Sequence, residues 1–370
     1  MDQMDPLRRS LGRGVFNRRN FLSGSAAGAL ALSTPAILRS SPARAEDKVV
    51  NVSGYGGLIS EYMTKLFGIP FEKKTGIKVN FGSNASLALA KLQATSGSPA
   101  QWDLISLTGS EYYVAIDQKL IVPYDYNIID ATHVPPEYKK PYGIKFSLFL
   151  FVMAWDKRKI SDDKAPQSWA EFWDTDRFKG KRSLYANISD GCTLENALLA
   201  DGVPLDKLYP LDVPRALRSL ERLGRDNIIW YNTNQEPIQQ LTSGAVTLAN
   251  AFDGRVALAN HDGAQLGFTP NYGGVSGNQY CVSAASARKT EAFQFLNFML
   301  TEAKADADYM ALTDYAVPNT AALDLVPQSI RDILPTSAVL KDKVFIKDDH
   351  WWATNLAQAT TTFKAWQLAG

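Results

Sequence analysis

Residues 49–81 read VVNVSGYGGLISEYMTKLFGIPFEKKTGIKVNF. A β-branched run at Val49–Val52 ends at the glycines of residues 54–57, and apolar residues then recur at helical spacing as far as Gly76. The residues after Gly76 alternate as in a strand. We predict strand, glycine turn, helix and strand. Such a turn lies at the carboxyl end of a strand, where open α/β sheets bind ligands, and the helix after it presents free backbone N–H groups.

Strand and helix patterns alternate along the rest of the chain, which implies a mainly parallel sheet with helices on its faces. The predicted strands are 103–107, 142–155, 182–185, 228–231, 246–251, 266–270 and 279–283, and the predicted helices are 83–94, 111–120, 168–173, 194–202, 212–223, 236–243, 289–299 and 355–368. The long aromatic strand Tyr142–Trp155 is interpreted as leaving a first lobe, to which residues 279–283 return. A turn is expected at Tyr272–Gly274, and a third crossing at Tyr315–Thr320.

The composition is that of a soluble globular protein, with 45% hydrophobic and 21% charged residues among 370. This length suggests two domains. A formal net charge of +1 gives no electrostatic reason to expect binding to nucleic acid or to an anionic membrane. After the N-terminal segment, no apolar run is long enough to cross a bilayer.

The first 45 residues are predicted to be a signal peptide. Arg18 and Arg19 precede a run of small and apolar residues at 21–38, and Ala43–Ala45 matches an A-x-A cleavage site. The paired arginines resemble a twin-arginine export signal and predict a periplasmic protein. A Sec signal and an uncleaved anchor are the alternatives.

Patterns for catalysis, metals and cofactors are absent from the sequence. No G-x-S-x-G stretch or metal-type spacing of histidines and cysteines occurs, and Gly54–Gly57 lacks the third glycine of a dinucleotide-binding loop. Cys192 and Cys281 fall in different regions and are predicted to be separate thiols. His350, beside Asp348 and Asp349, is interpreted as part of a polar loop. We predict no cofactor, no metal and no catalytic residue.

Aromatic residues mark the predicted strand ends and crossings, and as a set they suit a cleft that holds an apolar or cationic ligand. They are Tyr55, Tyr112, Tyr113, Phe252, Tyr280, Trp351 and Trp352. Asp190 and Asp253 also follow strand ends, where a carboxylate would meet a ligand ammonium. Arg255 either neutralises Asp253 or binds a ligand carboxylate.

Several segments in order resemble a known family. They are FEKKTGIKV at 71–79, WDL at 102–104, SWAEFW at 168–173, FKGKR at 178–182, LYPLD at 208–212, Gly273–Gly274, residues 292–298 and VPN at 317–319. From about Val49 onward the chain resembles the periplasmic substrate-binding proteins of ABC importers, in the branch that contains spermidine/putrescine-binding proteins. The resemblance implies a two-lobe α/β protein, a cleft that closes on a small solute by a hinge, and docking on a membrane permease.

The resemblance also implies an arrangement of domains and a site. The lobes would be 46–148 plus 279–315 and 149–278 plus 316–370, joined by crossover strands, in a monomer. The predicted ligand-binding residues are Ser53, Tyr55, Thr108, Ser110, Asp190, Phe252, Asp253, Arg255, Gln279, Tyr280 and Trp352. The aspartate that polyamine binders place on the returning strand falls near Gln279. This departure, together with Arg255, weakens the polyamine assignment more than the transport role.

The expected function is capture of a polyamine-like solute for an ABC permease. A zwitterionic or anionic solute, such as an opine or an amino-acid conjugate, is an alternative. Two alternatives from other classes are a secreted α/β hydrolytic enzyme and an exported dinucleotide-binding protein.

Overall fold

The computed structural model describes residues 48–369 except 55, 84 and 85. The predicted signal peptide lies outside these residues. Among the described residues, no helix is both long and apolar enough to cross a membrane.

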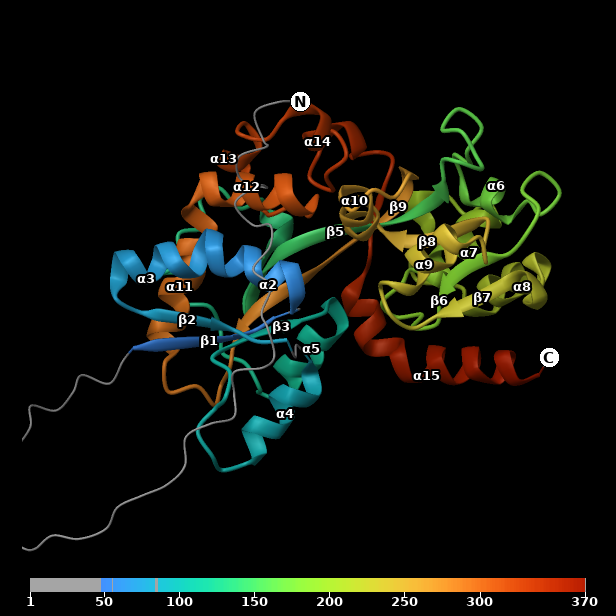
Figure 1. The fold of residues 1–370 in the computed structure, drawn as a ribbon. Helices are drawn as coiled ribbons and strands as arrows, with labels where there is room; N and C mark the ends of the chain where they lie inside the picture. Colours follow the sequence, from blue (N-terminus) through green and yellow to red (C-terminus); the bar gives the residue numbers. More distant parts are fainter. Residues whose placement is uncertain (1–47, 55, 84–85, 370) are drawn as a thin grey trace, which may run out of the picture. The chain divides into compact units, whose positions relative to one another are not determined.

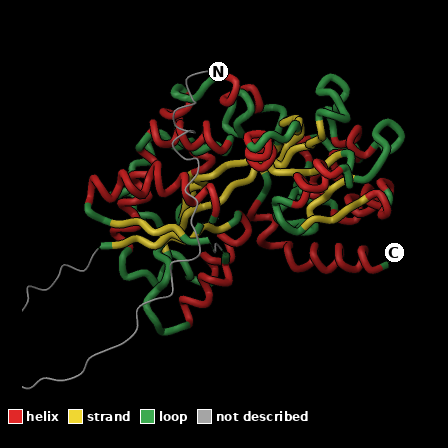
Figure 2. Tube along the Cα trace, in the orientation of Figure 1, coloured by secondary structure: helices red, strands yellow, loops and turns green. Residues whose placement is uncertain are grey.

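Ten strands form one sheet, in which two parallel groups flank an antiparallel pair (Figures 1 and 2). The first strand group is β1 (Val49–Ser53), β2 (Lys78–Phe81) and β3 (Leu104–Leu107), and the second is β6 (Arg182–Tyr185), β7 (Ile228–Tyr231) and β8 (Leu248–Phe252). Between them β5 (Gly143–Asp156) and β9 (Leu266–Val282) form a central ribbon, and the short strand β4 (Lys139–Lys140) pairs with β5. This mixed architecture confirms the predicted α/β class.

The two strand groups attach at opposite ends of the central ribbon. β3 pairs with residues 279–282 of β9, whereas β8 pairs with residues 151–155 of β5. The register of β5 against β9 is irregular between Lys145 and Ser147 and again between Phe151 and Met153. In the middle of the ribbon, short strand β10 (Phe345–Ile346) pairs with β9, and Leu148 bridges to Ala316. The predicted crossing near Ala316 therefore lies beside the ribbon.

Helices cover both groups of strands. In the first half α2 (Gly57–Met63), a π-helical turn at 64–68 and α3 (Ile69–Thr75) follow one another and end at Gly76, whose φ of 73° is left-handed, as predicted for a glycine stop. The other helices are α4 (Leu87–Thr95), α5 (Gly109–Asp117), α6 (Trp169–Trp173), α7 (Thr193–Ala200), α8 (Val213–Leu223), α9 (Glu236–Ser243), α10 (Asp253–His261), α11 (Lys289–Thr301), α12 (Ala303–Thr313), α13 (Thr320–Leu323), α14 (Gln328–Arg331) and α15 (Asp349–Leu368).

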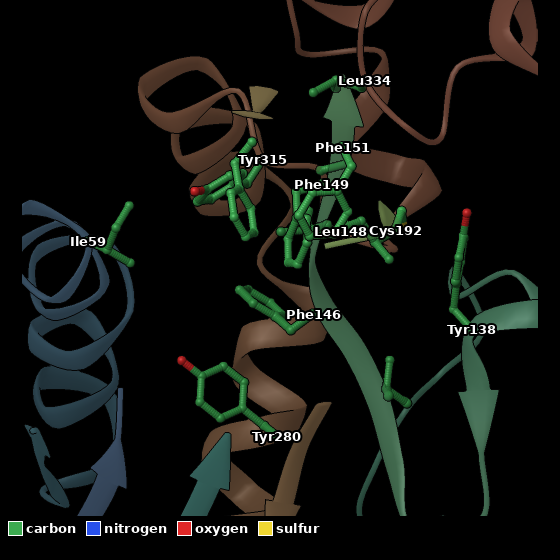
Figure 3. Packing of buried hydrophobic residues seen from close by; sticks show 14 of the residues in the cluster. Ile59, Tyr138, Phe146, Leu148, Phe149, Phe151, Cys192, Tyr280, Tyr315 and Leu334 are labelled. Atoms are coloured by element: carbon green, nitrogen blue, oxygen red, sulfur yellow. The ribbon is translucent and has the colours of Figure 1, made fainter. Parts of the chain in front are cut away.

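The largest core cluster follows the central ribbon. Phe146, Phe149 and Phe151 of β5 are buried, and Figure 3 shows their rings along the strand, with Tyr280 and Tyr315 nearby. The ring centroids of Phe149 and Phe151 are 5.6 Å apart. The aromatic character of the predicted crossing strand is therefore explained by burial, since every residue of β5 is buried.

The structure corrects several predicted boundaries. α4 begins at Leu87 with Ser86 as its N-cap rather than near residue 83. α15 begins at Asp349, not 355, because the Asp348 carboxylate accepts from the Trp351 N–H and starts the helix there. The pair Cys192 and Cys281 is buried and unbonded, which confirms two separate thiols.

β9 is one strand where two segments and a turn were predicted. The Gly273–Gly274 pair lies inside it, because other groups approach the backbone too closely for a side chain. A Cβ on Gly274 would lie 2.6 Å from the Cys192 sulfur and 2.7 Å from the Phe345 ring. These glycines therefore serve close packing inside a strand.

Candidate functional site

A cavity of about 290 Å³, the first cavity, opens where β1, β3 and β8 end. Gly54 follows β1, Thr108 follows β3, and Phe252 is the last residue of β8. The central ribbon contributes Ser147 and Asn278. Because carboxyl ends of parallel strands meet here, the cavity lies where open α/β sheets bind ligands, as the glycine turn predicted.

Hydroxyl groups and one carboxylate form the wall on the side of the first strand group. Ser106, Thr108 and Glu111 line it. The Thr108 N–H and hydroxyl donate to Glu111 Oε2 at 3.0 and 3.1 Å, and the Leu87 N–H donates to Oε1 at 3.1 Å. Glu111 thereby joins α4 to α5, so its oxygens are largely occupied by protein donors.

Opposite charges form the wall on the side of the second strand group. Asp190 lies in the loop between β6 and α7, and burial raises the pKa of its carboxyl group, an effect that nearby Lys347 and a hydrogen bond with Tyr185 partly oppose. Arg255 lies in the first turn of α10, and its buried Nε has no hydrogen-bond partner among the described residues. A guanidinium with an unsatisfied Nε and a carboxyl group therefore face the same space.

Aromatic rings form the apolar part of the lining. Phe149, Phe252 and Tyr315 meet there, with the Phe149 ring centroid 5.1 Å from that of Phe252 and 6.1 Å from that of Tyr315. Figure 3 shows Phe149 and Tyr315 close together, with Ile59 of α2 also facing this region. A Cβ on Gly254 would lie 2.1 Å from the Tyr315 ring, so the first turn of α10 needs glycine to pack on this ring.

Four predicted site residues line the first cavity: Thr108, Asp190, Phe252 and Arg255. Ser53 lies behind the wall, where its hydroxyl accepts from the Ser106 N–H at 3.2 Å. Tyr55 lies outside the described residues.

The other predicted site residues do not line the first cavity. Ser110 is buried in the first turn of α5, and Gln279 lines a different cavity. Tyr280 is buried beside Tyr124, whose hydroxyl donates to its carbonyl. These side chains serve packing or lie on other faces.

Asp253 and Trp352 are also buried in structural roles. Asp253 accepts from the Gly254 N–H at 2.7 Å, and among the described residues it forms no ion pair with Arg255. Trp352 donates its indole N–H to Glu195 Oε1 at 2.7 Å. The predicted neutralisation of Asp253 by Arg255 is therefore wrong.

The structure adds residues that sequence reasoning missed. They are Glu111, Ser147, Phe149, Asn234, Asn278 and Tyr315. Asn278 precedes the predicted Gln279. Because neighbouring side chains on a strand point to opposite faces, Asn278 lines the first cavity and Gln279 does not. Phe149 and Tyr315 belong to the two predicted crossings, so the signal for them was present.

The acidic residues around His350 have separate roles. Asp348 caps α15, Asp349 pairs with Lys145 at 2.7 Å, and the His350 ring packs edge-on against Tyr113. These residues begin a helix where a polar loop was predicted. Within the part of the chain that the structure describes, no three or more histidine, cysteine, aspartate or glutamate side chains are grouped to hold a metal ion.

Comparison with known proteins identifies relatives over most of the chain. A family model described as bacterial extracellular solute-binding protein matches residues 69–336. A gamma-aminobutyric acid-binding protein of Pseudomonas aeruginosa is 28% identical over 338 residues, which are 88% of this chain and 92% of the relative.

Solved structures of similar proteins support the same family. An ABC transporter substrate-binding protein from Bradyrhizobium japonicum is 30% identical, with a TM-score of 0.79 over 86% of this chain and 98% of that one. The periplasmic binding protein AgtB of Agrobacterium tumefaciens, solved with agropinic acid, is 26% identical, with a TM-score of 0.75 and the same coverage. The matched family and these relatives are solute-binding proteins and not enzymes, and their two-lobe fold matches this one.

Proposed function

Because the chain belongs to the family of bacterial extracellular solute-binding proteins, we propose that its first cavity captures a small solute carrying both a carboxylate and an amine. The chain is the substrate-binding component of an ABC transporter, and its family is an exported one. Delivery of this solute to the permease, after export by the twin-arginine route, completes the proposal.

The observation that carries the proposal is the guanidinium of Arg255. Its buried Nε has no acceptor among the described residues, and a buried donor without a partner loses free energy that a ligand acceptor restores. Guanidinium groups bind carboxylates through paired, charge-assisted hydrogen bonds. A solute carboxylate at Arg255 therefore satisfies the group that the fold leaves unsatisfied.

Asp190 supports the amine end of the same solute. Its carboxyl group lines the cavity that Arg255 also lines. A volume of about 290 Å³ is near the lower end of the range for ligand pockets, which favours a compact solute. Gamma-aminobutyric acid, which a relative is named for binding, carries one carboxylate and one amine.

A polyamine is the second candidate, and Asp190 with the rings of Phe149 and Phe252 is the observation that favours it. Arg255 acts against it, since a solute with two ammonium groups meets a like charge in a confined space. Arg255 therefore favours binding of a carboxylate-bearing solute and disfavours binding of a polyamine, and this difference separates the two candidates.

The test is calorimetric titration of the exported protein with γ-aminobutyrate, agropinic acid, putrescine and spermidine at one pH and ionic strength. We expect a carboxylate-bearing solute to bind, and Arg255→Met to weaken it at least 30-fold, about 2 kcal/mol or more. Arg218→Met, on the exposed face of α8, is the matched control and leaves affinity unchanged.

Two results would contradict the zwitterion proposal. Tight putrescine binding without binding of either carboxylate solute selects the polyamine. Unchanged solute affinity in Arg255→Met places the solute elsewhere. Mass spectrometry of small molecules that co-purify with the protein identifies the natural solute directly.

Hinged closure is part of the proposal, with lobes at 46–148 plus 279–315 and 149–278 plus 316–370. The irregular registers at 145–147 and 151–153 of β5 support hinge points there. α15 packs against both α5 and α8, so this helix contacts elements of both proposed lobes.

A further inference from the structure

A second cavity of about 420 Å³ lies on the other face of β9 from the first. Asn278 lines the first cavity and its neighbour Gln279 lines the second, as alternation along a strand requires. The second cavity is defined here by Tyr113, Lys140, Lys145, Tyr209, Gln279 and Lys347. It is separate from the proposed solute site.

Two buried lysines in this cavity share one carboxylate. The side chains of Lys145 and Lys347 are 6% and 1% exposed, and their ammonium groups lie 2.7 and 3.4 Å from Asp349 oxygens. Asp349 is held in place from the other side, since its carboxylate lies against Gly109, where a Cβ would come within 1.8 Å. Among the described residues, neither lysine pairs with a second carboxylate, so the buried group carries an excess positive charge.

Four other acidic groups lie nearby, and among the described residues none of them forms an ion pair with Lys145 or Lys347: Glu137, Asp190, Asp348 and Glu195. Glu137 and Asp348 are exposed at the rim, beside the half-buried Lys140. Glu195 accepts from Tyr209 and Trp352 through Oε1. Asp190 and Glu195 interact with Lys347 at longer range, and burial raises the pKa of both carboxyl groups.

Gln279 adds a polar group that the protein does not satisfy. The Gln279 residue is 1% exposed, and within the described part of the chain its buried Oε1 has no hydrogen-bond partner. Buried amides are otherwise hydrogen-bonded, and since amide nitrogen and oxygen are interchangeable by rotation, this group can donate or accept. An occupant with several oxygens and a hydroxyl satisfies the amide and the ammonium groups together.

We propose that the second cavity binds a small oxyanion of the phosphate type, held by the ammonium groups of Lys145 and Lys347 and oriented by the Gln279 amide. Lys145 belongs to β5, Gln279 to β9 and Lys347 to the segment between β10 and α15. The bound anion therefore connects both strands of the central ribbon to the segment after β10 and stabilises their packing.

The probe is inorganic phosphate, titrated into the full exported protein at constant ionic strength, with chloride replacing it in the reference. We expect saturable binding by calorimetry and a matching rise in melting temperature, since a ligand that binds only the native state stabilises it. Lys347→Met weakens phosphate binding at least tenfold, and it leaves Asp349 paired with Lys145. Gln279→Leu weakens phosphate binding at least threefold, and Lys343→Met, at an exposed lysine just before β10, leaves it unchanged.

Each of these comparisons has an outcome that would overturn the phosphate proposal. Equal stabilisation by chloride, or equal phosphate affinity in Lys347→Met and Lys343→Met, overturns the proposal. Loss of phosphate binding in Arg255→Met, with binding retained in Lys347→Met, places the anion in the first cavity and also overturns it. If Lys347→Met does not fold, Gln279→Leu decides between the same outcomes. Phosphate binding is independent of the solute, so failure here leaves the proposed function standing.

Discussion

Arg255 and Asp190 place a guanidinium and a carboxyl group on one wall of the first cavity, and the protonation of Asp190 controls what binds. Burial raises the pKa of the Asp190 carboxyl group from its ordinary value. The carboxyl group therefore holds its proton to a higher pH than an exposed aspartate. The pH dependence of binding follows from this residue.

We predict that affinity for an amine-bearing solute rises with pH and then levels off. An ammonium binds the ionised carboxylate, so binding releases a proton wherever Asp190 is still protonated, and affinity rises by up to about tenfold per pH unit there. Asp190→Asn removes the rise and corrects for titration of the solute itself. Calorimetry from pH 4 to 8 checks it, and parallel profiles for the two proteins would exclude Asp190 from the ammonium contact.

A second residue-scale prediction concerns Asp306, which is fully buried on α12. Its Oδ2 accepts from the Asn319 amide at 2.7 Å, its Oδ1 has no partner among the described residues, and burial raises the pKa of the carboxyl group well above its ordinary value. Below about pH 4 both folded and unfolded chains hold this proton and the contribution to stability is complete. As pH rises, the unfolded chain releases it first, so the free energy of unfolding falls until the folded pKa is passed.

Asp306→Asn keeps the acceptor for Asn319 and removes this decline. The difference between variant and parent should grow with pH by up to about 1.4 kcal/mol per unit within that window. Urea denaturation at several pH values measures it. The exposed Asp226→Asn serves as the control, and an identical slope for both variants would refute the assignment.

At the scale of elements, α10 decides the geometry of the first cavity. It begins at Asp253, directly after β8, and its first turn carries Arg255 to the wall while Gly254 receives the Tyr315 ring. We predict that Gly254→Ala costs about 1–3 kcal/mol of stability by overpacking. It should also weaken solute binding, because the displaced ring moves within the cavity lining.

Chemical denaturation and solute titration of Gly254→Ala check this prediction. Truncation of the ring supplies the control: in a Tyr315→Leu background the added methyl group should cost little, and the coupling between the two changes is the measured quantity. A cost that persists without the ring would indicate backbone strain instead of the Tyr315 contact.

The same element shows the limits of sequence reasoning. Asp253–Gly254–Arg255 has the composition of a turn, but it forms the first turn of α10, and its glycine admits the Tyr315 ring from another part of the chain. The turn predicted at Tyr272–Gly274 was wrong for a similar reason, since these glycines serve close packing inside β9. In contrast, the alternation in 49–81 and the aromatic run of β5 predicted their elements well, because local patterns of burial decide them.

The site residues also divide into those that local sequence patterns predict and those that depend on tertiary packing. Thr108, Asp190, Phe252 and Arg255 follow strand ends, and topology alone brings such ends together, so the sequence predicted them. Trp352 and Asn278 could not be assigned in this way. The first is buried by the packing of α15, and the second depends on a strand register set by partners distant in sequence.

At the scale of the molecule, the two strand groups share only the central ribbon and the segments beside it in the sheet. Asp190 and Arg255 lie on the side of the second strand group, and Ser106, Thr108 and Glu111 lie on the side of the first. A solute that contacts both walls gains contacts when they approach, and this differential affinity is what drives closure. An anion in the second cavity contacts the ribbon on its other face and has no such effect on the walls.

We therefore predict that saturating solute lowers the radius of gyration measured by small-angle X-ray scattering, whereas phosphate leaves it unchanged. Solute at 100 times its dissociation constant should also raise the free energy of unfolding by about 2.7 kcal/mol. Arg255→Met at the same solute concentration should show neither effect, while Arg218→Met should show both. Full stabilisation by the solute without a lower radius of gyration would contradict closure, because the solute would then bind without any approach of the two walls.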